Sequence, residues 1–421
     1  MIRTSENQNG GSFLPLSAEG FAPHSKLFLA FNALYFLPLL GVLFFNYSEG
    51  GATTAADLDP DTFVKIAWIY AAGCFAFLCG SRLDLLRMFS SSLSAKRELR
   101  LFRPTWMFWA ACLGVVGALL VSKVLLIRAG VYAEYAFDTE SMTGGAWSFS
   151  MFCAESLLFL SITVLFSRMR WNVLGFFLLS AVNGANLLHG TRVFTIIAGI
   201  VLCFYLYLRR KFNLRLALVA LAAFLAIGYF IFLTRSNAAL DEDSFSFTRI
   251  ISPVMFEGVF SQISLIQAVH NSYLWSYFGS PLHFFADALY FLAPRILLPQ
   301  KEAMLYADRF ADLSPLGAFS GYAQGLIYFG VAFPAFYFTL GTLATWLFRR
   351  AKDSSFWSVI YVYFACDFLF RVMRDGYIIP LKMLIDALII LAVIALFDPS
   401  TLAFARRSIE SSFSSPRIRP T

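Results

Sequence analysis

The sequence predicts an all-α polytopic membrane protein with about ten transmembrane helices and one large, partly helical external loop. Of its 421 residues, 59% are hydrophobic and only 14% are charged, whereas soluble globular domains carry roughly 25% charged residues. The mean hydropathy is +0.68. The apolar residues also gather in blocks of about 18 to 22, the length that a helix needs to cross the hydrocarbon core of a bilayer.

A pattern of apolar segments sets the predicted domain organisation. The segments cover residues 27–47, 63–80, 105–127, 149–167, 172–188, 193–208, 216–233, 321–348, 356–373 and 377–397. Only His189-Gly190-Thr191-Arg192 separates the fifth from the sixth, which predicts a tight helical hairpin. The chain is therefore expected to comprise a tail at 1–26, seven spans within 27–233, a loop at 234–320, three spans within 321–397 and a tail at 398–421. A loop of that length is expected to be functional and partly structured.

The distribution of lysine and arginine predicts the orientation of these spans. About two thirds of the 33 Lys and Arg residues fall in the two tails and in one alternating set of loops, of which 81–103 and 209–215 are the richest. The first loop of the other set, 48–62, carries four acidic residues and no Lys or Arg. By the positive-inside rule, both termini are cytoplasmic and the loop 234–320 is external.

Several other classes of protein are disfavoured by what the sequence lacks. No apolar signal segment with a cleavage site precedes Leu27, so no removable signal peptide is expected. The net charge of +7 is explained by loop charges that set membrane orientation rather than by nucleic-acid binding. The chain has no P-loop, no dinucleotide fingerprint, no His-Glu-x-x-His pattern and no Cys-rich metal site. The six cysteines lie inside apolar blocks and are interpreted as small hydrophobic residues.

Charged residues within the predicted spans gather towards the external side of the membrane. Glu155 falls in the outer third of the fourth span, and the pairs Asp367/Arg371 and Lys382/Asp386 lie towards the outer ends of the last two spans. Charges inside a bilayer are costly and often mark functional sites. Their shared depth therefore predicts a polar cavity beneath the external loop.

Plainer interpretations of these charges stay open at this point. Each of the two i,i+4 pairs could serve only to neutralise its own charges. Lys123 and Arg128, at the outer end of the third span, could extend their charged ends to the membrane surface. Glu155 has no such route to water, so we expect it to face a cavity or a cationic partner.

The external loop carries two predicted helices. Ser252-Pro253 is typical of an N-cap followed by proline at the first helical position, and the helix would run to His270 with Glu257 in its second turn. A second short helix is predicted at 281–292. Both are interpreted as amphipathic helices at the outer interface. The dense aromatic residues of this region fit an interfacial belt, and equally a surface for sugar rings.

Three short motifs accompany this layout. In Pro294-Arg295-Ile296-Leu297-Leu298-Pro299-Gln300-Lys301, two prolines hold an arginine and a lysine in a stiff, extended turn. Residues 317–330 are small and Gly-rich, and end in Tyr328-Phe329-Gly330 as they lead into the eighth span. Gly190-Thr191-Arg192 lies at the external hairpin.

On these motifs the sequence resembles the bacterial oligosaccharide repeat-unit polymerases, the Wzy-type O-antigen polymerases. Residues 294–301 look like the family's external Pro-Arg…Pro-x-Lys segment, and residues 317–330 look like its Gly-Glu-x-Tyr-x-Asn-Phe-Gly segment. Gly190-Thr191-Arg192 is similar to the Gly-x-Arg at an outer hairpin of these polymerases and of the related O-antigen ligases. Two positions depart from the family pattern: Gln324 stands where an acidic residue is common, and Ile327 where asparagine is common.

The resemblance implies a glycosyltransferase of the bacterial inner membrane, active at the periplasmic face in O-antigen or exopolysaccharide biosynthesis. A glycan on undecaprenyl pyrophosphate would be transferred as a block onto the terminal sugar of a lipid-linked repeat unit, and the lipid pyrophosphate would leave. The resemblance implies substrates held in the lipid bilayer, no nucleic acid, and no metal or other cofactor. A chain-length regulator and a flippase are the protein partners that such an enzyme would have.

The chemistry of that reaction selects candidate residues on the external side. A diphosphate leaving group needs fixed cations, and arginine binds phosphate in planar, bidentate geometry. The candidates for this role are Arg192, Arg249, Arg295, Lys301 and Arg371. The acceptor hydroxyl needs a general base. Glu257 is the first candidate, because its helix follows Arg249 closely, and His270 is the second, because histidine exchanges a proton near neutral pH. Further candidates are His283, Glu155 and Asp287.

Other functions stay open from the sequence alone. An O-antigen ligase would use the same donor, and the Pro-Arg-x-x-x-Pro-x-Lys segment is what favours a polymerase over a ligase. A transporter or flippase for such lipids would more often show an internal repeat and helices broken near mid-membrane. A membrane acyltransferase would require a histidine with an acidic partner in a buried channel, and the sequence shows no clear arrangement of that kind.

Overall fold

The computed structural model shows an assembly of packed helices. It describes residues 22–45, 58–83, 104–129, 145–167, 169, 171–189, 193–209, 215, 222, 226, 247–270, 281–293 and 319–397. The helices are α1 (Pro23–Phe45), α2 (Pro60–Arg82), α3 (Trp106–Arg128), α5 (Ala146–Leu165), α6 (Asn172–Asn183), α7 (Val193–Leu208), α9 (Phe247–His270), α10 (Pro281–Leu292), α12 (Gly321–Phe329), α13 (Phe333–Asp353), α14 (Ser355–Tyr363), α15 (Leu369–Asp375) and α16 (Ile378–Phe397). Two 3-10 turns, η3 (Gly184–His189) and η8 (Gly330–Ala332), and one π-helical turn, η9 (Phe364–Phe368), complete the described elements.

The helices coincide with most of the predicted spans. Within the described part of the chain, 6 helical segments are long and apolar enough to cross a membrane: Pro23–Leu43, Pro60–Arg82, Trp106–Arg128, Ala146–Leu165, Gly321–Lys352 and Ser355–Asp375. Two shorter apolar helices, Asn172–Leu187 and Val193–Leu208, match the fifth and sixth predicted spans, and α16 matches the tenth. The seventh, 216–233, lies outside the described residues except for two single positions. An all-α membrane protein is thereby confirmed, whereas the count of ten spans and their orientation stay predictions.

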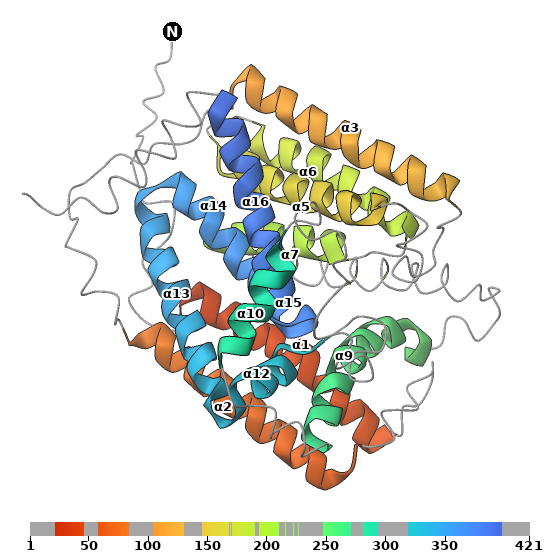
Figure 1. The fold of residues 1–421 in the computed structure, drawn as a ribbon, viewed down its shortest axis with the longest axis vertical. Helices are drawn as coiled ribbons and strands as arrows, with labels where there is room; N and C mark the ends of the chain where they lie inside the picture. The colour runs from red at the N-terminus through yellow and green to blue at the C-terminus, as the bar shows by residue number, and fades with distance from the viewer. Residues whose placement is uncertain are drawn as a thin grey trace, which may run out of the picture.

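Helix α5 lies at the centre of the second half of the bundle. All its residues from Cys153 to Leu165 are buried, and a helix that is apolar and buried on every side belongs inside a bundle. The helices α3, α6, α7, α14 and α16 pack around it. Figure 1 shows α3, α5 and α6 side by side at one end of the molecule. Any charged residue on α5 is therefore held inside protein.

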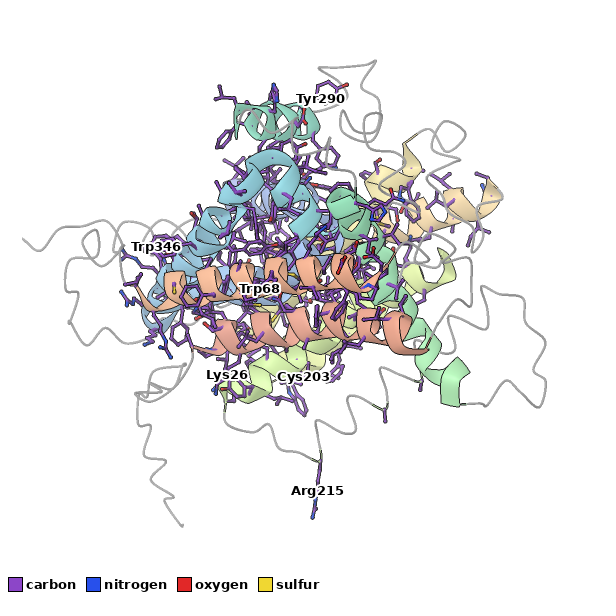
Figure 2. All side chains as sticks on the ribbon, turned by 90° about the horizontal axis from the view of Figure 1, so that it is seen from below. Lys26, Trp68, Cys203, Arg215, Tyr290 and Trp346 are labelled. Carbon is purple, nitrogen blue, oxygen red and sulfur yellow. The ribbon has the colours of Figure 1, made fainter. Side chains whose placement is uncertain are left out.

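Two glycines allow α2 and α13 to pack closely. A side-chain carbon on Gly80 would meet the backbone carbonyl of Phe338, and one on Gly341 would meet the backbone carbonyl of Phe77. Small residues at such a contact let helix backbones approach in membranes, where packing has to hold helices together. Helix α1 joins the pair through Phe28, whose ring stacks on Phe77 at 3.8 Å. Figure 2 shows α1 and α2 lying along one another at the front of the molecule.

The first predicted loop helix differs from expectation. Helix α9 begins at Phe247, so Ser252 and Pro253 lie inside the helix and the predicted N-cap is wrong. Among the described side chains of 258–269, all are buried except the half-buried Gln267. Helix α9 packs along α1, where Gly258 faces the ring of Pro38. An amphipathic surface helix would leave one face open, so that interpretation is wrong for this half of α9.

The second predicted loop helix matches its predicted range and its predicted character. Helix α10 buries Phe284, and it exposes Leu282, Phe285 and Leu289 on another face. In Figure 2, α10 is marked by Tyr290 and lies at one extremity of the molecule. This arrangement supports the amphipathic surface helix that the sequence predicts for 281–292.

The predicted eighth span is interrupted near its start. Helix α12 ends at Phe329, the turn η8 follows, and α13 begins at Phe333. Gly330 has a φ of 54°, a backbone conformation that glycine adopts without steric cost. The chain can therefore change direction here, and α12 becomes a separate short helix beside α13 (Figure 1).

Candidate functional site

Five charged side chains from two distant parts of the chain form one network, which we call the charge cluster: Glu155, Asp367, Arg371, Arg374 and Asp375. Arg371 is at its centre. Its Nε donates to Asp367 Oδ1 at 2.6 Å, and its Nη2 donates to Glu155 Oε2 at 3.1 Å. Its Nη1 lies 3.7 Å from Asp375 Oδ2, and Arg374 Nη1 donates to Asp375 Oδ1 at 2.6 Å. The Glu155 contact joins α5 to α15.

The cluster is enclosed by apolar and aromatic side chains. Glu155 is 1% exposed and Arg371 is 3% exposed. The hydroxyl of Tyr363 donates to Glu155 Oε1, and the ring of Phe194, on α7, lies 5.0 Å from Arg371 Cζ. Buried charges persist in such surroundings when they are paired and hydrogen-bonded. The predicted cationic partner of Glu155 is confirmed, and the Asp367/Arg371 pair is formed.

Glu155 lies deeper in its helix than the sequence indicated. It is the tenth of the 20 residues of α5, which runs from Ala146 to Leu165. At 1.5 Å per residue it is about 14 Å from either end. The prediction that Glu155 falls in the outer third of its span is wrong, because the helix begins and ends earlier than the apolar segment 149–167 suggests.

The charge cluster ends at a sharp, buried turn between α15 and α16. Gly376 has a φ of 76°, which favours glycine, and a side-chain carbon there would meet the carboxamide of Gln324. Gln324 Oε1 accepts a hydrogen bond from the backbone amide of Tyr377. The backbone carbonyl of Arg374 accepts one from the amide of Phe319 at 3.0 Å. Residues 319–324 therefore close this turn.

One of the three sequence motifs contacts the turn, and the described residues that follow a second motif contact α15. The Gly-rich motif 317–330 contributes the contacts just described, and Gly321 packs against the backbone carbonyl of Val372. The hairpin motif Gly190-Thr191-Arg192 is followed in sequence by α7, whose second residue, Phe194, lies over Arg371. The motif 294–301 lies outside the described residues. The Gly-rich motif and the start of α7, which are far apart in sequence, thus both contact α15.

The other predicted phosphate-binding residues are placed only in part. Arg192, Arg295 and Lys301 lie outside the described residues. Arg249 and the predicted base Glu257 belong to α9 by their backbone, and their side chains are not among those described. Arg371 is described, and all of its guanidinium nitrogens face carboxylates.

The second predicted base, His270, contacts the start of α2 and no member of the cluster among the described contacts. Its Nδ1 lies 3.4 Å from Thr62 Oγ1. Asp59 caps α2 there, because its Oδ1 accepts a hydrogen bond from the Thr62 amide at 2.6 Å. The amide and hydroxyl of Thr62, with a smaller contribution from His270, hold the pKa of Asp59 below its usual range. The other base candidates lie on α10, where His283 is exposed and Asp287 Oδ2 accepts from the Tyr328 hydroxyl at 2.7 Å.

The charge balance of the cluster limits what each residue can do. Three carboxylates face two guanidinium groups, so the cluster carries an excess negative charge when every group is ionised. Arg371 could reach a diphosphate only by releasing a carboxylate, which would then be buried without a partner. Arg374 differs, because its side chain is 25% exposed. Within the described residues, no group of three or more His, Cys, Asp or Glu side chains is arranged to hold a metal ion.

Four members of this site are not among the candidate residues selected from the sequence: Tyr363, Gln324, Arg374 and Asp375. One signal could have found Asp375, because Asp367, Arg371 and Asp375 recur every four residues and so share a helix face. Tyr363 and Gln324 carry no such signal, since their partners are distant in sequence.

No protein-family model, curated protein or solved structure matches the chain. The case for a function therefore depends on the motifs and on the geometry of the cluster.

Proposed function

We propose that this chain is a metal-independent membrane glycosyltransferase that polymerises undecaprenyl-pyrophosphate-linked oligosaccharide repeat units at the periplasmic face of the bacterial inner membrane. The observation that carries the proposal is that the Gly-rich motif, and Phe194, which follows the hairpin motif by two residues, contact the charge cluster and its turn. Both motifs resemble those of repeat-unit polymerases, and residues of one site have to meet in space.

The free-energy cost of burying the charge cluster also supports a functional role for it. Four of its five side chains are almost fully buried, in a core made mostly of hydrophobic side chains. Charges at membrane depth are rare and usually mark a functional site. A cluster required only to join α5 to α15 could be replaced by apolar packing at no loss of stability. We therefore assign Arg371 and Glu155 a positioning role, in which they hold the α15–α16 turn in place.

In the proposed reaction, a hydroxyl oxygen of the acceptor sugar attacks the anomeric carbon of the donor glycan. The bond from that carbon to the pyrophosphate oxygen breaks, and the lipid diphosphate leaves with the bonding electrons. We assign Arg192, Arg249, Arg295 and Lys301 to the leaving diphosphate, where fixed cations stabilise the developing charge. The acceptor proton passes to a general base, for which Glu257 and then His270 are the candidates.

Deletion of the gene, followed by gel analysis of surface polysaccharide, tests this function. Polysaccharide that stops at one repeat unit supports a polymerase. Long chains that are made but never attached to their acceptor indicate a ligase. Chain lengths like those of the parent strain would contradict the proposal.

Single substitutions test the cationic residues. We expect Arg192→Ala and Arg295→Ala each to abolish long chains at unchanged protein level, because each removes a charge from the leaving group. Arg128→Ala is the matched control, since Arg128 is an exposed arginine at the end of α3 on the same predicted side. A normal chain-length ladder in Arg192→Ala or Arg295→Ala would remove that residue from the site.

A flippase for the same lipids is the second candidate, because one observation favours it. The break between α12 and α13 is the kind of interruption that transporters place near their substrate. A flippase defect would leave lipid-linked repeat units at the cytoplasmic face, whereas a polymerase defect would leave them at the periplasmic face. Their accessibility to an external glycosidase in spheroplasts of the deletion strain separates the two functions.

A further inference from the structure

Lys123, on α3, is a buried charge outside the charge cluster. Its side chain is 3% exposed, and its Nζ has no hydrogen-bond partner among the described residues. The ammonium lies 5.5 Å from the centre of the Trp147 ring, on α5. The interpretation that Lys123 extends to the membrane surface is wrong, because its terminal nitrogen is itself buried. A buried ammonium without a counter-charge is costly, so this position calls for an anion.

The neighbouring end of α5 also favours an anion. Trp147 is the second residue of α5, and the helix is preceded by Gly145, which has a φ of 82° and makes no side-chain cap hydrogen bond. The first turn contains no acidic residue. Backbone amides and the helix dipole make such an N-terminus attractive to negative charge. The N-terminus would be weak evidence alone, but the buried ammonium of Lys123 lies beside it.

Ser150 adds a third donor on the same face of α5. It is three residues after Trp147, which places the two side chains next to one another on the helix. Ser150 is 0% exposed, and its hydroxyl has no hydrogen-bond partner among the described residues. A buried ammonium beside Trp147 and a buried hydroxyl one helical turn further along thus both lie at the N-terminal end of α5.

We propose that Lys123, Ser150 and the N-terminus of α5 bind the phosphate group of a lipid. A phosphate presents several acceptor oxygens, which three separate donors can share. Lys123 is the eighteenth of the 23 residues of α3 and Trp147 the second of α5, so both lie near the helix ends that the sequence predicts to be external. Lipid phosphates lie at that level, and tryptophan is enriched there. The phosphate can belong to a bilayer phospholipid or to a lipid diphosphate, and the inference does not depend on the proposed function.

Binding of phosphatidylglycerol to the purified, delipidated full chain tests this site. We expect phosphatidylglycerol to raise the unfolding temperature of the wild-type protein, and diacylglycerol, which lacks the phosphate, to have no such effect. Lys123→Met should bind phosphatidylglycerol about tenfold more weakly or worse, as expected for the loss of one charge-assisted hydrogen bond. Lys65→Met is the control, because Lys65 is an exposed lysine on α2. Equal affinity in wild type and Lys123→Met overturns the proposal.

The thermal stability of the lipid-free variants provides a second test of the proposed site. Without lipid, Lys123→Met should unfold at a higher temperature than the wild type, because an apolar side chain replaces an uncompensated charge. The segment 130–144, which lies outside the described residues, contains Glu134, Asp138 and Glu140. If Lys123→Met is instead destabilised, and the combined variant Glu134→Gln, Asp138→Asn, Glu140→Gln is destabilised equally, a carboxylate of the chain is the counter-charge and the proposal fails.

Native mass spectrometry of protein taken directly from membranes identifies the source of the phosphate. A bound phospholipid mass that is lost in Lys123→Met supports a structural lipid. A bound polyprenyl diphosphate mass that is lost in the same variant supports a substrate site. Retention of either lipid by Lys123→Met at the wild-type level, or the absence of any phosphorus-containing lipid from the wild type, contradicts the inference.

Discussion

At the scale of single residues, Glu155 and Arg371 show how one buried pair fixes two helices. Arg371 contacts three carboxylates, and Glu155 is additionally hydrogen-bonded by Tyr363. Every polar atom of Glu155 thus has a partner, which is the condition under which a buried charge is tolerated. Removal of Arg371 would leave Glu155 buried without a cation, whereas removal of Glu155 would leave Arg371 with Asp367 and Asp375.

The first prediction concerns that dependence. Arg371→Met should lower the free energy of unfolding by about 3–5 kcal/mol, because three buried carboxylates lose their shared cation. The matched control is Lys382→Met, whose ion pair with Asp386 spans 3.9 Å and whose side chain is 39% exposed; its cost should stay within about 1 kcal/mol. Denaturant unfolding in detergent measures both. Equal, small losses would show that the pairing of Arg371 contributes little.

The second prediction concerns pH. Since the Thr62 hydrogen bonds lower the pKa of Asp59, ionised Asp59 stabilises the folded state at neutral pH, and this contribution disappears as the pH falls through the lowered pKa. The difference in unfolding temperature between wild type and Asp59→Ala should therefore shrink from pH 7 to pH 3. A difference that stays constant over this range would mean that the charge of Asp59 does not matter to the cap.

At the scale of elements, the α15–α16 turn is the segment most constrained by its surroundings. Its glycine has a positive φ, its backbone amide at Tyr377 is bound by Gln324, and its carbonyl at Arg374 is bound by Phe319. Residues 319–324, where the predicted external loop meets the predicted eighth span, thus hold the turn that follows the charge cluster. A change in the conformation of the turn should therefore displace both residues 319–324 and the charge cluster.

The third prediction follows from this constraint. Gly376→Ala should destabilise the protein by about 1–3 kcal/mol, because alanine disfavours this backbone conformation and its side-chain carbon meets Gln324. Gly117→Ala is the control, since open space surrounds Gly117 on α3, and alanine there should stabilise the helix by roughly 0.5–1 kcal/mol. Unfolding of the two variants in parallel gives the comparison. A neutral Gly376→Ala would show that the turn relaxes freely.

The elements also show what the sequence could and could not predict. Apolar blocks of helical length identified α1, α2, α3 and α5 because length and hydropathy are local properties. The break at Gly330 and the burial of α9 were missed, because both depend on what packs against the segment. At the site, the Asp367/Arg371 ion pair could be predicted from the spacing of four residues on one helix. The identity of the cation that pairs with Glu155 could not, because only the fold brings α5 next to α15.

At the scale of the whole molecule, the positive-inside pattern predicts which ends of the helices face the cytoplasm. The orientation bears on the charge cluster, because Phe319, at the end of the predicted external loop, and Gln324, just after it, close the α15–α16 turn. In the function that we propose, the loop and the charge cluster form one site, and an inverted protein could not use a periplasmic substrate.

The fourth prediction tests that orientation. A cysteine introduced at Ser244, in the predicted external loop, should react with a membrane-impermeant maleimide in intact spheroplasts. A cysteine introduced at Ser91, in the Lys- and Arg-rich loop 81–103, should react only after the membrane is opened. The parent chain with its six native cysteines gives the background. Labelling with the opposite pattern would exclude a periplasmic reaction site.

The separation of Glu155 and Arg371 has a consequence for biosynthesis. They are 216 residues apart in the chain, so at 5–20 residues per second the ribosome needs roughly 10 to 40 s to supply the arginine after the glutamate. During that interval α5 enters the membrane with a carboxylate that lacks its cation. Nascent chains arrested after α7 should therefore hold α5 loosely and be degraded quickly, and full-length chains should become protease-resistant only once α15 has been inserted.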